Sequence, residues 1–134
     1  MLKVNEIYLS VQGESSYTGL PCVFIRLTGC NLRCEWCDTA YAFYEGKSMS
    51  IDEIVGKVKK FGVKLVEITG GEPLMQENVY PLMNRLIGKG FQVMLETGGS
   101  LSLEKVPRDI IKIMDIKCPG SGEHKNNNLD NLKF

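Results

Sequence analysis

Histidine and net charge are both nearly absent from this sequence. His124 is the only histidine, which excludes zinc sites with several imidazole ligands and catalytic schemes with two histidines. Sixteen Lys and Arg residues balance sixteen Asp and Glu residues, so the net charge does not indicate a nucleic-acid or membrane-surface protein. A small neutral or anionic ligand is the better expectation.

Long apolar runs are missing as well. Residues 1–6 lack the apolar segment of a signal peptide, and no later run is long and apolar enough to span a bilayer. The cysteines number five, and three of them are clustered, which favours metal binding in a reducing compartment over a disulfide framework. We therefore predict a cytoplasmic protein that binds neither membranes nor nucleic acid.

The chain is long enough to bury one core and too short for two ordinary domains, since it has 134 residues, 43% of them hydrophobic. We predict a single domain over residues 1–134. Within it, residues 1–119 form the ordered part. Residues 120–134 contain three consecutive asparagines and few apolar residues, which predicts an irregular tail.

Short apolar runs alternate with helical patterns along the chain. Strands are predicted at residues 6–11, 22–28, 64–69, 91–96 and 110–116. Helices are predicted at 51–61, where Ser50 and Glu53 can form a capping box, and at 77–87, which Gly88 closes. Strands that alternate with helices pair in parallel through right-handed crossovers, which predicts an α/β fold.

Polar and glycine residues follow the carboxyl ends of these strands. They lie at residues 30–37, 70–72, 96–99 and 115–117. In parallel α/β sheets and barrels, this edge of the sheet carries the ligand site. We therefore expect these four segments to share one cleft.

The strongest chemical signal is the Cys-x-x-x-Cys-x-x-Cys spacing of Cys30, Cys34 and Cys37. Three thiolates on one loop can bind three corners of a four-iron cluster and leave one iron with open coordination. An open iron can bind and reduce a small molecule.

Zinc is an alternative for the same cysteines. Structural zinc normally shows two separated ligand pairs, and that spacing is missing here. A zinc site would need a fourth ligand from Cys22, Cys118 or His124. A non-catalytic iron–sulfur or zinc-binding module therefore stays open as a second class of function.

A second motif, Thr69-Gly70-Gly71-Glu72-Pro73, follows the strand predicted at 64–69. Two glycines let the backbone approach a ligand where a Cβ would clash, and a nearby carboxylate can accept hydrogen bonds from an ammonium group. Taken alone, a Gly-Gly pair after a strand is usually a turn. Beside the cysteine loop, it indicates ligand contact.

Together these two motifs resemble the signature of the radical S-adenosylmethionine enzymes. The resemblance implies an incomplete (β/α) barrel of the radical SAM type with a [4Fe–4S] cluster on Cys30, Cys34 and Cys37. It implies that the open iron binds the amino and carboxylate groups of S-adenosylmethionine. Reductive cleavage of the sulfonium bond then gives a 5′-deoxyadenosyl radical that abstracts hydrogen from the substrate.

More of the chain resembles one family, the 7-carboxy-7-deazaguanine synthases of the queuosine and deazapurine pathway. The matching stretches are residues 10–14, 24–27, 29–39, 41, 96–99 and 115–122. The resemblance implies a lyase that contracts the ring of 6-carboxy-5,6,7,8-tetrahydropterin to 7-carboxy-7-deazaguanine with loss of ammonia. It also implies Mg²⁺, a homodimer and a flavodoxin- or ferredoxin-type electron donor.

The same resemblance implies roles for individual residues. The pterin substrate would contact Gln12, Glu14 and Arg26, and Thr39 would ligate a Mg²⁺ bound to its carboxylate. The residues implied at S-adenosylmethionine are Gly70, Gly71, Glu72, Glu96, Thr97 and Ser121. A guanidinium can hold a carboxylate with two hydrogen bonds, and Mg²⁺ prefers oxygen ligands. The alternative for Arg26 is a structural ion pair with Glu67 or Glu96.

The chain also departs from the family pattern. Ser15 and Gly99 stand where relatives commonly carry glycine and asparagine. Family members usually continue past Phe134 with further strands, so we expect the carboxyl-terminal part of the barrel to be truncated or supplied by another chain. Glycyl-radical activating enzymes share the cysteine loop and are the alternative among enzymes. Gln12-Gly13-Glu14 and Cys37-Asp38-Thr39 argue against that alternative.

Overall fold

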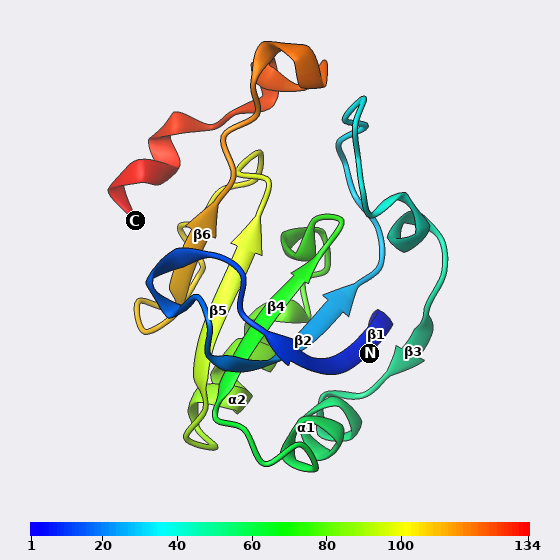
Figure 1. Ribbon diagram of the computed structural model, residues 1–134, viewed down its shortest axis with the longest axis vertical. Coiled ribbons are helices and arrows are strands. Elements are labelled where there is room, and N and C mark those ends of the chain that lie inside the picture. The colour runs from blue at the N-terminus through cyan, green and yellow to red at the C-terminus, as the bar shows by residue number, and fades with distance from the viewer.

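The computed structural model describes residues 1–134 and is organised around one sheet in the order β3-β1-β2-β4-β5-β6 (Figure 1). The strands are β1 Leu2–Val11, β2 Pro21–Leu27, β3 Lys47–Met49, β4 Leu65–Gly70, β5 Gln92–Thr97 and β6 Ile111–Met114. The strands β2, β4, β5 and β6 are parallel, whereas β1 is antiparallel to both β2 and β3. The parallel strands place their carboxyl ends at one edge.

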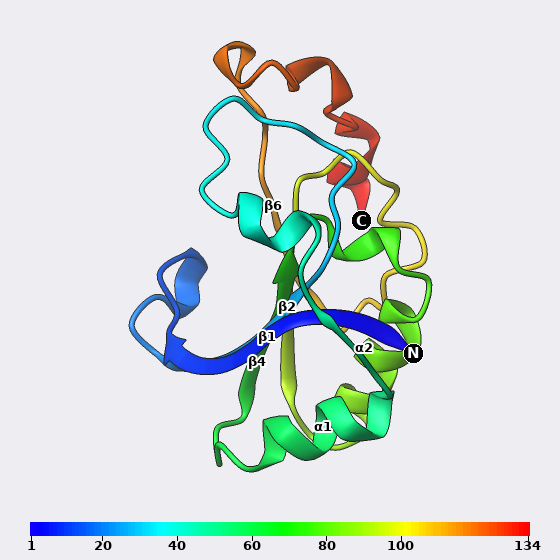
Figure 2. The same cartoon turned by 90° about the vertical axis from the view of Figure 1, so that its right-hand side faces the viewer.

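Two helices, α1 Ile51–Lys59 and α2 Val79–Ile87, lie on one side of this sheet (Figure 2). Their buried side chains, such as Ile54 and Leu82, form the main core with Ile25 and Ile68 of the sheet. The predicted capping box begins α1, because Ser50 Oγ accepts from the Glu53 N–H at 3.2 Å and the Glu53 carboxylate accepts from the Ser50 N–H at 2.6 Å. This face is therefore the packed face.

The opposite face of the sheet, here called the inner face, carries both apolar and polar side chains. Tyr8 and Phe24 stack there with ring centroids 5.3 Å apart, above the buried Met94. Arg26 follows Phe24 with the same parity on β2, and Glu67 lies opposite Phe24 on β4. A functional site can be built on this face because no α-helix covers it in Figure 2.

The predicted α/β fold is confirmed, and the sheet is open, with β3 and β6 at its edges. It is therefore part of a barrel rather than a closed one. The structure differs from the prediction in β1, which begins at Leu2 and runs antiparallel, and in β3, which the sequence did not indicate. None of the helices has the length and apolar character needed to cross a membrane.

The tail contains no strand or α-helix but is more ordered than its composition suggests. It forms short 3-10 turns at Pro119–Ser121, His124–Asn126 and Leu129–Lys133. Asn131 is buried, and its side-chain amide accepts from the Leu103 N–H at 3.0 Å and donates to the Leu101 carbonyl at 2.8 Å. Asparagine amides thus satisfy loop backbone groups and dock the tail.

Candidate active site

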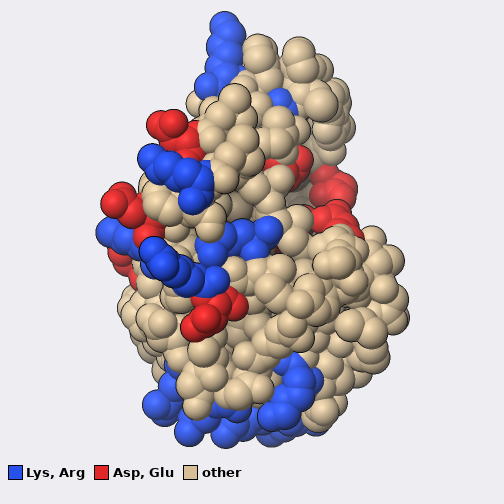
Figure 3. Space-filling view, turned by 90° about the vertical axis from the view of Figure 1, so that its left-hand side faces the viewer, with Lys and Arg blue, Asp and Glu red and all other residues tan.

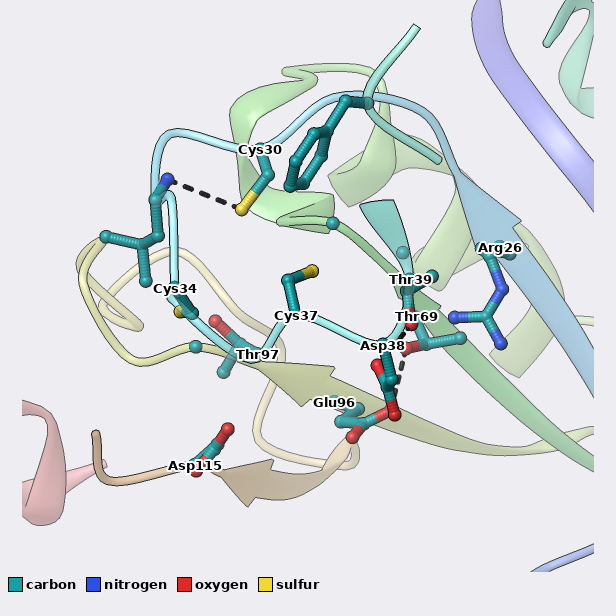
Figure 4. Close-up of a pocket in the computed structure, with 15 residues that line it drawn as sticks. Arg26, Cys30, Cys34, Cys37, Asp38, Thr39, Thr69, Glu96, Thr97 and Asp115 are labelled. Atoms are coloured by element: carbon teal, nitrogen blue, oxygen red, sulfur yellow. Dashed lines mark hydrogen bonds between the residues drawn. The ribbon is translucent and has the colours of Figure 1, made fainter. Parts of the chain in front are cut away.

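A pocket opens at the carboxyl ends of β2, β4 and β5 (Figure 4). Its lining includes the three clustered cysteines, the glycines after β4, residues 96–98 after β5, and Asp115 after β6. The expectation that the four strand-end segments share one cleft is therefore confirmed. The sequence signal was sufficient because parallel strands bring these segments together at one edge.

The cysteine loop leaves β2 and packs directly on the segment after β4. The Gly29 carbonyl accepts from the Glu72 N–H at 2.8 Å. At Gly71, an added Cβ would lie 2.4 Å from the Gly29 oxygen and 2.6 Å from the Cys30 Cβ. Glycine is therefore required at 71 by the close approach of the two segments.

Cys30, Cys34 and Cys37 are free, half-buried and placed around the pocket. Burial raises the pKa of Cys30, whose sulfur accepts from the Leu32 N–H at 3.4 Å. No three His, Cys, Asp or Glu side chains converge to hold a single metal ion. A four-iron cluster offers each thiolate a separate iron, so the three thiols fit such a cluster by their number, chemistry and shared pocket.

The loop is also held from outside by two neighbours. The Arg33 guanidinium lies 4.4 Å above the Phe43 ring and donates to the Cys30 carbonyl at 2.8 Å. The tail supplies Glu123, whose carboxylate accepts from the Arg33 N–H at 2.6 Å, and the Ser121 carbonyl, which accepts from the Glu35 N–H at 3.0 Å. These contacts fix the loop without any ligand.

Glu72 is 1% exposed and does not line the pocket. Its carboxylate accepts from the Leu74 N–H at 3.0 Å, from the Thr97 hydroxyl at 2.8 Å and from the Gly98 N–H at 2.9 Å. Burial raises the pKa of Glu72, although these hydrogen bonds lower it. The side chain ties the segment after β4 to the segment after β5.

Arg26 and Thr39 both line the pocket, with Asp38 beside them. Figure 4 shows the Arg26 guanidinium directed toward Thr39 and Thr69. The Thr39 hydroxyl donates to the Asp38 carboxylate at 2.6 Å. Arg26 pairs with Glu6, at 2.9 Å, and so the alternative of an ion pair with Glu67 or Glu96 is wrong.

Gln12 is 2% exposed, and both ends of its side-chain amide are used within the protein. Its nitrogen donates to the Glu67 carboxylate at 2.5 Å, and its oxygen accepts from the Glu14 N–H at 3.0 Å. Burial raises the pKa of Glu67 to about 7; the hydrogen bond from Gln12 lowers it, and the Glu96 and Glu14 charges raise it further. Gln12 therefore orders its own loop.

Carboxylates gather around the mouth of the site, and Figure 3 shows acidic side chains around a hollow in the upper half of the molecule. The charge of Glu96 is the largest cause that raises the pKa of Glu14, followed by burial and by Asp115. Glu96 itself accepts from the Thr69 hydroxyl at 2.7 Å. A cationic ligand group would be attracted to this region.

Of the residues expected at the site, the structure brings nine to the pocket lining. They are Arg26, Cys30, Cys34, Cys37, Thr39, Gly70, Gly71, Glu96 and Thr97. The other four lie outside the lining: Gln12, Glu14, Glu72 and Ser121. Ser121 is fully buried, and its hydroxyl donates to the Cys118 carbonyl at 2.6 Å.

Sequence analysis missed Glu6, Thr69 and Arg33 as parts of the site. A signal for Glu6 was present, because Ile7, Leu9 and Val11 alternate with Glu6 and Tyr8 and so leave these two on the other face. No comparable signal marked Arg33, whose role depends on a ring and a carboxylate that are distant in sequence.

Known proteins match this chain in sequence. The model of the radical SAM superfamily matches residues 24–116. The 7-carboxy-7-deazaguanine synthase of Koribacter versatilis is 54% identical over 98% of this chain and 59% of the relative. The enzyme of the same name from Chlorobaculum tepidum is 46% identical over 94% of this chain and 57% of the relative. The chain thus spans about three fifths of the length of these relatives.

A solved structure agrees with the sequence matches. The crystal structure of QueE from Escherichia coli superposes with a TM-score of 0.81 at 25% identity, over 98% of this chain and 67% of that chain. The strand order and the position of the site are thus those of a known fold. Because the superfamily model matches well over half of the chain, the chain belongs to the radical SAM superfamily, and within it resembles the 7-carboxy-7-deazaguanine synthases.

Proposed function

We propose that this chain carries the cluster and cofactor site of a 7-carboxy-7-deazaguanine synthase. The reaction is ring contraction of 6-carboxy-5,6,7,8-tetrahydropterin to 7-carboxy-7-deazaguanine with loss of ammonia. The single observation that supports this most is the placement of Arg26 and Thr39 in the same pocket as Cys30, Cys34 and Cys37. The sequence identity of 54% to a relative of that name supports it independently.

Membership of the superfamily implies a [4Fe–4S] cluster and S-adenosylmethionine. When bound, they supply a carbon-centred radical that removes a hydrogen atom from the substrate. The residues that would hold the cluster are Cys30, Cys34 and Cys37. The backbone of Gly70 and Gly71 and the side chains of Glu96 and Thr97 line the remaining pocket and would contact S-adenosylmethionine.

The substrate carboxylate is proposed to bind Arg26. The guanidinium lines the pocket with a half-buried side chain, so a carboxylate there would be partly desolvated and its hydrogen bonds strengthened. Thr39 and Asp38 place a hydroxyl and a carboxylate at the same wall. Oxygen atoms of these types suit Mg²⁺, which we propose would bridge them to the substrate.

Further parts of the proposal concern the whole protein. By resemblance to its relatives, we propose a homodimer and a flavodoxin- or ferredoxin-type electron donor. The five free cysteines suit a reducing compartment such as the cytoplasm.

Anaerobic reconstitution with iron and sulfide, followed by product analysis, tests the function. The reconstituted protein, a reductant, S-adenosylmethionine, Mg²⁺ and 6-carboxy-5,6,7,8-tetrahydropterin are expected to yield 7-carboxy-7-deazaguanine and ammonia. A matched Cys34→Ala variant is expected to yield neither. Formation of 5′-deoxyadenosine without any conversion of this pterin would contradict the proposed substrate.

A further inference from the structure

An extra residue interrupts the pairing of β1 with β2. Val4 pairs with Leu27 and Glu6 pairs with Arg26, so two steps along β1 correspond to one step along β2. Asn5 is the additional residue, and its side-chain amide donates to the Glu45 carbonyl at 3.2 Å. This is a β-bulge, a feature that often re-aims side chains beside functional sites.

The bulge changes which side chains face the helices. Before it, Leu2 and Val4 are buried in the helix-packed core, and after it Ile7 packs against the same core. Tyr8 instead packs on the inner face, against the cluster that contains Phe24. Without the bulge, strict alternation would direct Glu6 into the apolar core. With it, Glu6 shares the inner face with Arg26.

On that face Glu6 forms the centre of a hydrogen-bonded group. One carboxylate oxygen accepts from Arg26 Nε at 2.9 Å and from the Tyr41 hydroxyl at 3.0 Å. The Tyr8 hydroxyl accepts from Arg26 Nη2 at 3.0 Å, and the Tyr41 ring lies 5.8 Å from the guanidinium. The Nη1 group of Arg26 has no acceptor in the protein, and Figure 4 shows the guanidinium facing the pocket.

We propose that Glu6 is a positioning residue that holds Arg26 in the orientation in which its free N–H groups bind a carboxylate of the substrate. This proposal rests on the proposed function. The guanidinium is planar, so fixing its Nε edge to Glu6 also fixes the direction of the opposite edge. Fewer rotamers are then lost when the ligand binds.

A purely structural role for the pair is disfavoured by its exposure. The Glu6 side chain is 40% exposed and that of Arg26 is 15% exposed. Ion pairs with an exposed partner contribute little to folding stability. The loss of Glu6 should therefore change ligand affinity more than it changes the melting temperature.

The test measures binding of two pterins to the reconstituted protein with S-adenosylmethionine and Mg²⁺. The probes are 6-carboxy-5,6,7,8-tetrahydropterin and 5,6,7,8-tetrahydropterin, which lacks the carboxylate. In Glu6→Ala, affinity for the carboxylated pterin and its KM are expected to weaken about tenfold, with kcat nearly unchanged. The pterin without the carboxylate should bind as it does to the wild type.

Two further variants complete the comparison. Glu6→Gln keeps an acceptor oxygen for Nε and Tyr41 and is expected to restore most of the affinity. Glu77→Ala removes another exposed ion pair, with Lys105 at 3.7 Å, and is expected to match the wild type. Equal loss of both pterins in Glu6→Ala, or unchanged affinity for the carboxylated one, would overturn the role of Glu6.

A separate readout distinguishes this inference from the proposed function. Modification of Arg26 by phenylglyoxal, located by mass spectrometry, is expected to be faster in Glu6→Ala than in the wild type because the guanidinium is released. Equal rates would overturn the inference. Wild-type protein that binds neither pterin would contradict the proposed function, and the modification rates would still decide whether Glu6 restrains Arg26.

Discussion

The burial of Glu67 has a consequence for stability that depends on pH. Glu67 is 3% exposed, and burial raises its pKa from 4.5 to about 7. The folded protein therefore binds this proton more tightly than the unfolded chain does. As pH rises from about 4.5 to about 7, the unfolded chain releases the proton first, and the folded state loses stability until both forms are ionised.

We predict that Glu67→Gln is more stable than the wild type at alkaline pH, because its amide keeps the hydrogen bond to Gln12 without a buried charge. The advantage should grow by about 1 kcal/mol, or roughly 3 °C in melting temperature, between pH 6 and pH 8.5. Melting curves at both pH values measure it. An advantage that shrinks as pH rises would contradict the raised pKa of Glu67.

Gly71 gives a second prediction at the scale of one residue. Gly71→Ala should lower the iron content of the reconstituted protein at least several-fold, because the new Cβ would lie 2.4 Å from the Gly29 oxygen and displace the cysteine loop. Iron and sulfide analysis measures this. Normal iron content would show that the loop can move without losing the cluster.

Within the secondary-structure elements, α1 offers a matched control for that substitution. Gly56 lies inside α1, and an added Cβ there meets no atom within 4 Å. Gly56→Ala should therefore raise the free energy of unfolding by roughly 0.5–1 kcal/mol through helix propensity, with unchanged iron content. Denaturant titration measures the gain, and a loss of stability would count against an open site at Gly56.

The tail is an element whose role emerged only in the structure. Glu123→Ala removes the acceptor of the Arg33 N–H, so the cysteine loop should open more often. We expect a chelator to remove iron several-fold faster from this variant than from the wild type. Glu104→Ala, whose exposed side chain is remote from the loop, is the control. Equal rates in all three proteins would argue that the tail does not stabilise the loop.

At this scale the sequence predicted the elements that carry a strong local pattern. The helix beginning after Ser50 and the parallel strands agree with the structure because capping residues and apolar periodicity act within a few residues. The direction of β1 and the existence of β3 depend on pairing across the chain. The Gly-Gly segment and the three cysteines were found for the same local reason, whereas Glu6 and Arg33 act through distant partners.

For the whole molecule, the core and the cysteine loop are separate structures. The main core is built from the sheet, α1 and α2 and contains none of the three clustered cysteines. Removal of iron should therefore leave the far-ultraviolet circular dichroism unchanged. Amide hydrogen exchange should become faster mainly in residues 29–39 and 119–126. Loss of strand signal on iron removal would show instead that folding depends on the cluster.

The single additional residue in β1 makes the length of this strand as constrained as its composition. Deletion of Asn5 would exchange the two sides of everything that follows in β1, so that Glu6 and Tyr8 would point into the helix-packed core and Ile7 into the ligand side. A point substitution changes one side chain, but a one-residue shortening here would invert half a strand. Variation in this segment should therefore conserve residue number even where residue type changes.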